Sequence, residues 1–403
     1  MLDTPFPPWP SFTPEEVDAV ADVLRSNRVN YWTGGECRNF EKEFAAWAGT
    51  NYAVALANGT VALDVALHAL EIGAGDEVIV TPRTFMASAS CVINAGATPI
   101  FAEVDAESGN LTAASIAAVI TPRTKAVIIV HLGGWPVDLD PVVQLARAHS
   151  IAIIEDCAQA HGARYGGASI GSIGDIGAWS FCQDKIMTTG GEGGMVTTSD
   201  PKLWQRMWSF KDHGKSWDAV YNRSHPPGFR WVHETIGTNW RMLEVQAAIG
   251  RIQLRRMADW NAARTRNAAV LTRHLGPLAD AGGPIRLPLL TCPHGGGDSC
   301  CTHGWYKYYF YLRPEKLCCD WTRDRAVEEI NRAGVPCYHG SCSEAYLEKA
   351  FVDRQLGPPA RLPIARALGE TSVMMLVHPT LAANHMELAG KVAASVLRQA
   401  ATA

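Results

Sequence analysis

Ile151-Ala152-Ile153-Ile154-Glu155-Asp156 is an apolar run that ends in two carboxylates. A second apolar run, Ala178-Trp179-Ser180-Phe181, lies further along the chain and leads into Lys185. Short runs of this kind, bounded by charge or glycine, predict strands of a buried sheet. The sequence thus places a carboxylate at the end of one strand and an amine just beyond another.

The pattern extends outward from these two strands. Further short runs rich in Val or Ile cover residues 78–80, 100–104 and 126–132, and helix-like stretches cover residues 60–70 and 141–149. Strands that alternate with helices predict a mostly parallel α/β sheet with helices on both faces. Ligands bind such sheets at the carboxyl ends of the strands, so the residues that follow each run are the candidates for function.

The character of the sequence changes after about residue 255. A polar helix over 255–275 is followed by a Gly-, Pro- and Cys-rich stretch over 282–303 and an aromatic run over 305–312. These features predict a smaller α+β domain. A chain of 403 residues, 47% of them hydrophobic, is long enough for two domains. We expect a large ligand-binding domain with an N-terminal arm over 1–255 and a small domain over 256–403.

Composition excludes several classes of protein. The 36 basic and 40 acidic residues give a net charge of -4, which argues against a nucleic-acid partner. No apolar run is long enough to cross a membrane, and residues 1–12 lack the pattern of a secretory signal. The 11 cysteines, an odd number, suit reduced thiols in the cytoplasm.

Three features together indicate a pyridoxal-phosphate site. Such a site needs a lysine amine, a carboxylate beside the pyridine nitrogen, and a phosphate cradle at the start of a helix. Lys185 and Asp156 supply the first two, and residues 57–60, which open the helix over 60–70, supply the third. Each feature alone has an ordinary alternative, namely a solvated charge or a helix cap. Their order and combination favour the cofactor site.

Longer motifs resemble those of the DegT/DnrJ/EryC1/StrS family of pyridoxal-phosphate-dependent aminotransferases, which act mostly on nucleotide-linked keto-sugars. The resemblance covers nearly the whole chain. It rests on Trp32-Thr33-Gly34-Gly35, Asn58-Gly59-Thr60-Val61-Ala62-Leu63, Gly75-Asp76-Glu77-Val78-Ile79, Thr84-Phe85, Glu155-Asp156-Cys157-Ala158-Gln159, Ser180-Phe181 through Lys185 to Gly194, and Gly237-Thr238-Asn239-Trp240-Arg241-Met242.

The resemblance implies a role for each matching position. The expected fold is the type I, aspartate aminotransferase-like fold of pyridoxal-phosphate-dependent transferases. Lys185 would carry the cofactor as a Schiff base and move the substrate proton, and Asp156 would pair with the pyridinium nitrogen. The resemblance further implies cofactor contacts from Gly59, Thr60, Phe85, Gln159 and Ser180, from Asn239 of the second subunit of a homodimer, and substrate contacts from Trp32, His213 and Arg241.

The reaction that the resemblance implies is amino transfer from glutamate or glutamine to a keto-sugar, in antibiotic or surface-polysaccharide sugar biosynthesis. Pyridoxal 5'-phosphate would be the cofactor, with pyridoxamine 5'-phosphate as its intermediate form. A cyclitol or ring-ketone aminotransferase shares every cofactor motif and stays open. A sugar dehydratase of the same family is disfavoured because those members carry histidine in place of Lys185. The sequence does not identify the acceptor, its nucleotide or the ring position aminated.

Functions of other classes find less support. A non-catalytic regulator would have lost Lys185, Asp156 or the cradle, and all three are present. No G-x-G-x-x-G follows a strand and no G-x-x-x-x-G-K-[ST] occurs, so dinucleotide and P-loop sites are disfavoured.

Two further clusters have both a functional and an ordinary interpretation. Cys292, His294, Cys300, Cys301 and His303 are of metal-ligand type, but their spacing is not that of paired CxxC knuckles. We therefore expect a loop with reduced thiols and assign no metal ligand. The tyrosines over 306–311 could form a sugar-stacking platform, but a core strand of the small domain is favoured. His213 is as consistent with a plain loop as with a substrate contact.

Overall fold

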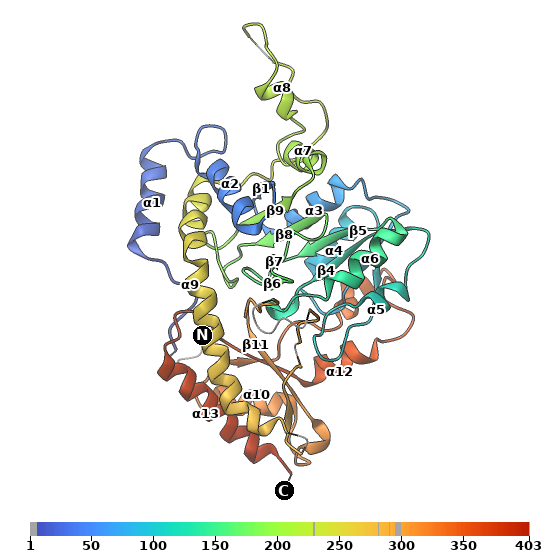
Figure 1. Cartoon of the computed structure of the whole chain (residues 1–403), viewed down its shortest axis with the longest axis vertical. Coiled ribbons are helices and arrows are strands. Elements are labelled where there is room, and N and C mark those ends of the chain that lie inside the picture. Colours follow the sequence, from blue (N-terminus) through green and yellow to red (C-terminus); the bar gives the residue numbers. More distant parts are fainter. Residues whose placement is uncertain (1–5, 229, 281, 290, 295–299, 403) are drawn as a thin grey trace.

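The large domain is built on a central sheet in the computed structural model, which describes residues 6–228, 230–280, 282–289, 291–294 and 300–402 (Figure 1). The described residues form a seven-stranded sheet in the order β1-β9-β8-β5-β4-β2-β3. Its strands are β1 (Tyr52–Leu56), β2 (Glu77–Val80), β3 (Thr98–Phe101), β4 (Thr124–Val130), β5 (Ala152–Asp156), β8 (Ile176–Ser180) and β9 (Gly194–Thr198).

The sheet is mostly parallel, as the alternation of strands and helices predicts. Strands β3, β2, β4, β5 and β8 pair in parallel, and β9 runs antiparallel between β8 and β1. The carboxyl ends of β5 and β8 therefore lie side by side. This register brings the segment after Asp156 next to the segment that leads to Lys185.

Helices cover both faces of the sheet. Successive strand residues point to opposite sides, and the residues on both sides are apolar and buried. Val127 and Ile129 of β4 pack with one group of helices, and Ala126 and Ile128 pack with another. The first group is α2 (Glu36–Ala48), α5 (Ala113–Ala117), α6 (Leu139–His149) and α9 (Glu244–Leu275), and the second is α3 (Gly59–Ala69), α4 (Ala87–Asn94) and α7 (Pro201–Phe210).

The small domain has its own core. An antiparallel sheet in the order β10-β11-β13-β12 packs with α10 (Arg323–Arg332), α13 (Ala383–Ala400) and the end of α9. Its strands are β10 (Ile285–Arg286), β11 (Tyr308–Leu312), β12 (Cys337–Tyr338) and β13 (Ser372–Met375). The remaining helices are α1 (Pro14–Arg25), α8 (Trp217–Tyr221), α11 (Lys349–Val352) and α12 (Pro363–Thr371), and β6 (Arg164–Tyr165) and β7 (Ala168–Ser169) form a separate hairpin.

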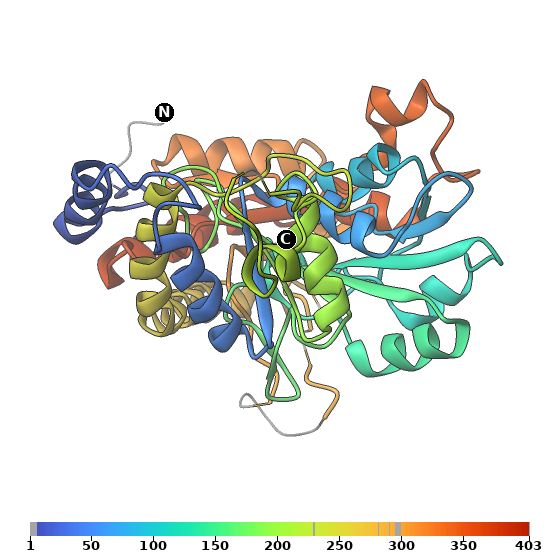
Figure 2. The same cartoon turned by 90° about the horizontal axis from the view of Figure 1, so that it is seen from above.

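Helix α9 connects the two domains. It begins at Glu244, before the start at 255 that the sequence predicts, and its N-terminal half lies beside α1 and α2 at one end of the molecule (Figure 2). Gly250 permits the close packing, because a Cβ there would lie 2.7 Å from the Phe40 ring. The division at residue 255 falls within α9 and stays a prediction.

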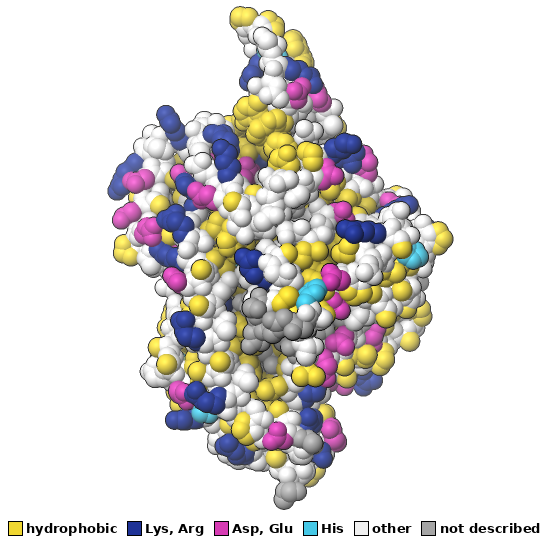
Figure 3. Space-filling model, in the orientation of Figure 1, with side chains coloured by type: hydrophobic (Ala, Val, Ile, Leu, Met, Phe, Trp, Pro, Cys, Tyr) yellow, Lys and Arg dark blue, Asp and Glu magenta, His cyan; other side chains and the backbone are white. Residues whose placement is uncertain are grey.

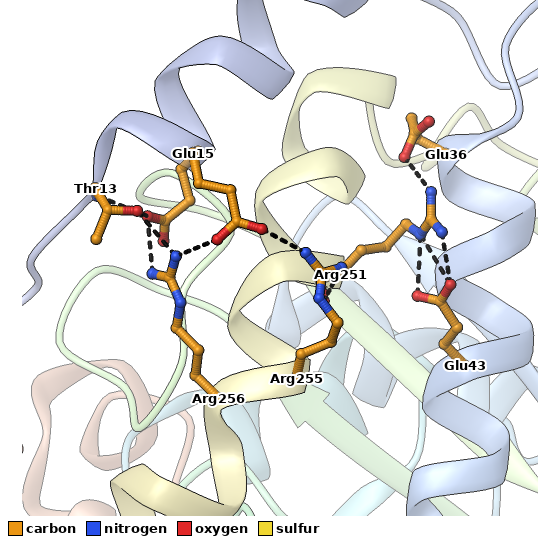
Figure 4. Close-up of polar contacts among 8 residues, drawn as sticks. Thr13, Glu15, Glu36, Glu43, Arg251, Arg255 and Arg256 are labelled. Carbon is orange, nitrogen blue, oxygen red and sulfur yellow. Dashed lines mark hydrogen bonds and ion pairs between the residues drawn. The ribbon is translucent and has the colours of Figure 1, made fainter.

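Ion pairs join α9 to the two N-terminal helices (Figure 4). Arg251 binds Glu43 and Glu36 of α2 at 2.7 and 2.6 Å. Arg256 binds Glu15 and Glu16 of α1 at 2.6 and 3.0 Å. Both arginines are partly buried, so these networks position α1 and α2 more firmly than isolated surface pairs would.

The segment around α8 projects from the large domain (Figure 1). Figure 3 shows hydrophobic side chains on this projection and at its base. Trp231 and Ile236 are 81% and 89% exposed, and Tyr221 is also exposed. Exposed apolar side chains gathered in this way are typical of interaction surfaces.

Candidate active site

A cavity of about 1620 Å³ opens where the carboxyl ends of β5 and β8 face the small domain. Tyr306, Tyr309 and His378 contribute the small-domain wall. Seven residues that the sequence predicts at the site line the other walls, namely Gly59, Thr60, Phe85, Asp156, Gln159, Ser180 and Lys185. The structure therefore gathers the predicted amine, carboxylate and cradle around one cavity.

Lys185 follows β8 in a short turn, in which its N–H donates to the Cys182 carbonyl at 3.0 Å. Its own carbonyl accepts a hydrogen bond from Trp9 Nε1 at 2.8 Å, so the backbone is held on both sides. The Nζ atom lies 3.8 Å from Asp184 Oδ1 and 5.0 Å from the centre of the Tyr306 ring. The amine thus reaches into the cavity from a fixed backbone.

Asp184 and Tyr306 form the immediate surroundings of that amine. The Tyr306 hydroxyl donates a hydrogen bond to the Asp184 carboxylate. Partial burial raises the pKa of Asp184, but the charge of Lys185 and the Tyr306 hydroxyl outweigh it, and the pKa is lowered overall. Asp184 therefore stays ionised at neutral pH beside Lys185.

Asp156 is the last residue of β5 and is 6% exposed. Its Oδ2 accepts from Ser88 Oγ at 2.7 Å, and its Oδ1 accepts from the Ala158 N–H at 3.1 Å. Burial raises the pKa of Asp156, and the hydrogen bonds and the Lys185 charge offset this only in part. A cationic nitrogen placed against this carboxylate would favour its ionised form.

Glu155, the neighbour of Asp156, faces away from the cavity. Its carboxylate accepts from the N–H groups of Gly171, Ile173 and Gly174 at 2.7, 2.8 and 2.6 Å and pairs with His131 Nε2 at 3.1 Å. Burial raises the pKa of Glu155, but these partners lower it overall. Glu155 therefore anchors a loop, and Asp156 is the carboxylate that is open to a ligand.

The phosphate cradle lies at the start of α3. Asn58 caps the helix, and its side chain accepts from the Val61 N–H at 3.0 Å. Gly59 and Thr60 are the first helical residues, so no turn of the helix satisfies their N–H groups. A Cβ on Gly59 would lie 2.5 Å from the Ser180 Cβ, so only glycine lets the helix start approach Ser180. Two backbone donors and a hydroxyl suit a phosphate group.

Gln159 and Phe85 complete the walls around the predicted ring position. Gln159 Oε1 accepts from the Gly133 N–H at 2.8 Å, which orients its amide. Phe85 is 71% exposed although it is a large apolar side chain. A planar ligand in the cavity would cover this ring.

Four predicted site residues do not line the cavity of their own chain. Trp32 Nε1 donates to Asp212 Oδ1 at 3.4 Å, and Arg241 binds the same oxygen at 2.7 Å. Asn239 forms a backbone bridge with Asp212, and His213 is exposed beside it. These residues form a second group, here termed the Asp212 cluster. The cluster adjoins the cradle segment, since the Ala57 N–H donates to the Trp240 carbonyl at 2.9 Å.

The cavity also contains residues that sequence reasoning did not single out. Lys307 lies in the small-domain wall, with its Nζ 4.8 Å from the centre of the Tyr306 ring. Desolvation, the Arg264 charge and the Lys185 charge lower the pKa of Lys307 to about 8, against the opposing effect of Asp184. Ser88, the partner of Asp156, lies in α4 and follows Phe85 by three residues. No local sequence pattern marks Lys307 or Ser88, because the place of each residue in the site depends on how separate elements pack together.

Some aromatic residues over 305–312 lie in the core of the small domain, and others lie at the cavity. Tyr308 and Phe310 of β11 are buried in the small-domain core, as the favoured interpretation predicts. Tyr306 and Tyr309 line the cavity instead.

None of the described helices is both long and apolar enough to span a bilayer.

Comparison with known proteins gives consistent matches. Residues 10–396 match the model of the DegT/DnrJ/EryC1/StrS aminotransferase family. GDP-perosamine synthase of Caulobacter vibrioides is 39% identical over 303 residues, which are 74% of this chain and 75% of that protein.

Solved structures match over nearly the whole chain. An aminotransferase from Psychrobacter cryohalolentis is 57% identical, with a TM-score of 0.95 over 98% of this chain and 100% of that one. The PLP-form of a putative sugar aminotransferase, Spr1654 from Streptococcus pneumoniae, is 25% identical, with a TM-score of 0.83 over 99% of each chain.

Proposed function

The chain belongs to the DegT/DnrJ/EryC1/StrS aminotransferase family, and on this premise we propose that it moves the amino group of glutamate or glutamine to a nucleotide-linked keto-sugar. One observation carries the proposal. Lys185, Asp156 and the phosphate cradle formed by Gly59 and Ser180 all line the same cavity. This is the donor set that a pyridoxal-phosphate enzyme requires.

The cavity fits pyridoxal 5'-phosphate in each of its parts. When bound, this cofactor supplies an electron sink that allows an amino group to pass between carbon atoms. Lys185 Nζ would hold it covalently, and Asp156 would pair with its ring nitrogen. Gly59, Thr60 and Ser180 would hold its phosphate. The buried position of Asp156 supports this assignment, since a buried carboxylate needs a cationic partner to stay ionised.

Lys185 has a second task, which is to move a proton. Once its amine is released, Nζ would move a proton between the substrate carbon and the cofactor in each half of the reaction, away from the donor carbon in the first half and onto the acceptor carbon in the second. Two neighbours favour the position of this amine. Asp184 Oδ1 lies 3.8 Å from Nζ, and the centre of the Tyr306 ring lies 5.0 Å from it. Because Trp9 fixes the backbone of Lys185, the amine returns to the same position in each half of the reaction.

The size of the cavity supports a large acceptor. Sites for small molecules usually occupy roughly 300–1,000 Å³, and this cavity has about 1620 Å³. It extends from the cradle at Gly59 to Trp9 and Tyr338, beyond the space that the cofactor alone requires. A relative that makes a GDP-linked amino sugar supports a nucleotide-linked ketone as acceptor.

We further propose that the active enzyme is a homodimer with shared sites. The Asp212 cluster, which contains Asn239, lies outside the cavity of its own chain, and Phe85 is exposed at the cavity wall. The apolar projection around Trp231 and Ile236 would pack against a second copy. Asn239 of the partner subunit would then reach the phosphate. Trp32, His213 and Arg241 remain candidate substrate residues, which a partner subunit would contribute in the same way.

We also propose a cytoplasmic location, because 11 scattered cysteines suit reduced thiols.

A half-reaction screen tests the proposed acceptor. The enzyme with bound cofactor is treated with glutamate or glutamine until its visible absorbance is lost, and excess donor is removed. GDP-, UDP- and TDP-linked keto-sugars and a nucleotide-free ring ketone are then added separately. We expect a nucleotide-linked keto-sugar to restore the absorbance. Restoration by the ring ketone alone would contradict the nucleotide-linked acceptor, and no restoration by any ketone would contradict both acceptor classes.

A further inference from the structure

A cluster of three cysteine thiols lies outside the cavity. The Sγ atoms of Cys292, Cys300 and Cys301 all lie within 4.8 Å of one another. Those of Cys292 and Cys301 are 2.8 Å apart. The sequence favours a loop with separate thiols here, because the spacing of the cysteines matches no paired CxxC motif. The fold nevertheless brings the three sulfur atoms to one point.

The backbone that carries two of these thiols is fixed on the β6–β7 hairpin. Arg164 and Thr302 exchange two backbone hydrogen bonds, at 3.1 and 2.9 Å. The Gly167 N–H donates to the Cys300 carbonyl at 2.7 Å, and the Gly166 N–H contacts the Cys301 thiol. Cys300 and Cys301 are therefore held as an added strand, which is a preorganised arrangement.

A histidine lies against the same hairpin. The His294 ring packs edge-on against Tyr165, with 4.7 Å between ring centres. Its Nδ1 lies 3.7 Å from Asp140 Oδ2. Its Nε2 would be 3.2 Å from a Cβ placed on Gly166, the glycine whose N–H contacts Cys301. A carboxylate beside one ring nitrogen is the usual setting of a metal-bound histidine. Neither ring nitrogen lies within 4.8 Å of all three sulfur atoms, so the His294 ring would have to move toward them to bind the same ion.

We propose that Cys292, Cys300, Cys301 and His294 bind one structural zinc ion. Zinc prefers four tetrahedral ligands, and Zn–S bonds of about 2.3 Å place neighbouring sulfur atoms roughly 3.8 Å apart. The sulfur atoms of Cys292 and Cys301 are closer than that, at 2.8 Å, and all three sulfur atoms lie within 4.8 Å of one another, so small shifts would reach this distance. Thiolate and imidazole ligands select zinc over magnesium or calcium, which prefer oxygen. With four protein ligands the site has no open position, so its role is structural.

Zinc binding would proceed with release of the thiol protons. Zn²⁺ displaces these protons to the solvent, with no change in oxidation state. The ion would then tie Cys292 and His294 to the hairpin on which Cys300 and Cys301 are held. The chain continues from there to Tyr306 and Lys307, so the zinc site would also fix the entry into the small-domain wall of the cavity.

Metal analysis of the full-length enzyme, purified under reducing conditions, tests this inference. We expect one zinc per chain. After chelation, added Co²⁺ should give the intense near-ultraviolet bands of thiolate-bound cobalt. Cys292→Ser and Cys301→Ser should lose the stoichiometric zinc, and His294→Ala should lower zinc affinity at least tenfold. Cys319→Ser, which removes an exposed thiol outside the cluster, is the matched control and should retain the metal.

Other outcomes would overturn the inference. Wild-type enzyme without zinc that also takes up no Co²⁺ would exclude a metal site. An intact mass lower by two hydrogens, with peptides joined through Cys292 and Cys301, would assign the cluster to a disulfide. Unchanged zinc affinity in His294→Ala would exclude His294 as the fourth ligand. Retention of the cofactor absorbance by each variant shows that a lost metal does not reflect misfolding.

Discussion

Gly59 and Ser180 show how one atom can control the proposed cofactor site. A Cβ at position 59 would lie 2.5 Å from the Ser180 Cβ and 2.9 Å from its Oγ. These are distances that side chains essentially never adopt, and both residues belong to the cradle. Residue 59 must therefore be glycine if the start of α3 is to lie this close to Ser180 in the proposed phosphate site.

Gly59→Ala should weaken cofactor binding about 5- to 150-fold, because overpacking of a tight contact costs roughly 1–3 kcal/mol. Titration of cofactor-free enzyme, followed by absorbance, measures the change. Gly276→Ala is a suitable control, because its added Cβ meets nothing within 4 Å and its φ of -50° suits alanine. Equal affinity of the two variants would mean that the cradle is not at Gly59.

The end of β5 illustrates the scale of a structural element. Glu155 and Asp156 are adjacent, but they point to opposite sides of the strand and have different partners. Glu155 accepts three backbone N–H groups from the loop over 171–174, whereas Asp156 accepts one hydroxyl and one N–H. Strand geometry alone thus gives one carboxylate an architectural role and leaves the other for the ligand.

Glu155→Gln should destabilise the protein by about 2–3 kcal/mol at neutral pH, because several charge-assisted hydrogen bonds are weakened. The pKa of Glu155 is lowered in the folded state from an ordinary value of 4.5. Its contribution to stability is therefore present above pH 4.5 and is lost as the pH falls through the folded pKa. Thermal melts should show the two proteins converging on acidification below 4.5. A constant difference across that range would contradict the assignment.

Sequence patterns predict elements unevenly. Strands over 126–132 and 151–154 are expected because their Val and Ile runs are long and clearly bounded. The structure has a strand at each place, with β4 two residues earlier than expected at Thr124–Val130 and β5 at Ala152–Asp156. The strand over 100–104 was expected too far along the chain. The structure has β3 at Thr98–Phe101, because its partner β2 ends at Val80. The first turns of α9, over 244–254, lie before the helix start at 255 that the sequence predicts.

The candidate site shows the same unevenness. Asp156, Lys185 and Gly59 each follow a strand or open a helix, so local patterns and family motifs were enough to select them. Lys307 and His378 reach the cavity only because the small domain docks there. No periodicity within either segment reports that docking. Sequence reasoning therefore misses residues that a second domain contributes, and it also misses Ser88 of α4, whose role depends on packing against β5.

At the scale of the whole molecule, the proposed homodimer has a consequence that a monomer cannot reproduce. Lys185→Ala removes the amine from one site, whereas Asn239→Glu places a negative charge where the partner's phosphate would lie. Each variant alone should be nearly inactive. In a mixed dimer, one of the two sites combines an intact Lys185 with an intact Asn239.

Mixing the two variants after subunit exchange should therefore restore activity to about one quarter of wild type, because half of the dimers are mixed and each has one intact site. Steady-state amino transfer measures the recovery. A mixture of Lys185→Ala with Lys185→Met is the control and should stay inactive. Absence of recovery, with exchange verified by native mass spectrometry, would show that the sites are not shared.

The central claim is that Lys185 holds the cofactor, and the cavity provides a demanding test of it. Among the described residues that line it, two are lysines, and the pKa of the second, Lys307, is lowered to about 8. Borohydride reduction fixes the cofactor to whichever lysine bears it, and peptide mass spectrometry then locates the label. We expect a label on Lys185 that is retained in Lys307→Met and lost in Lys185→Ala. A label on Lys307, or on neither lysine, would contradict it.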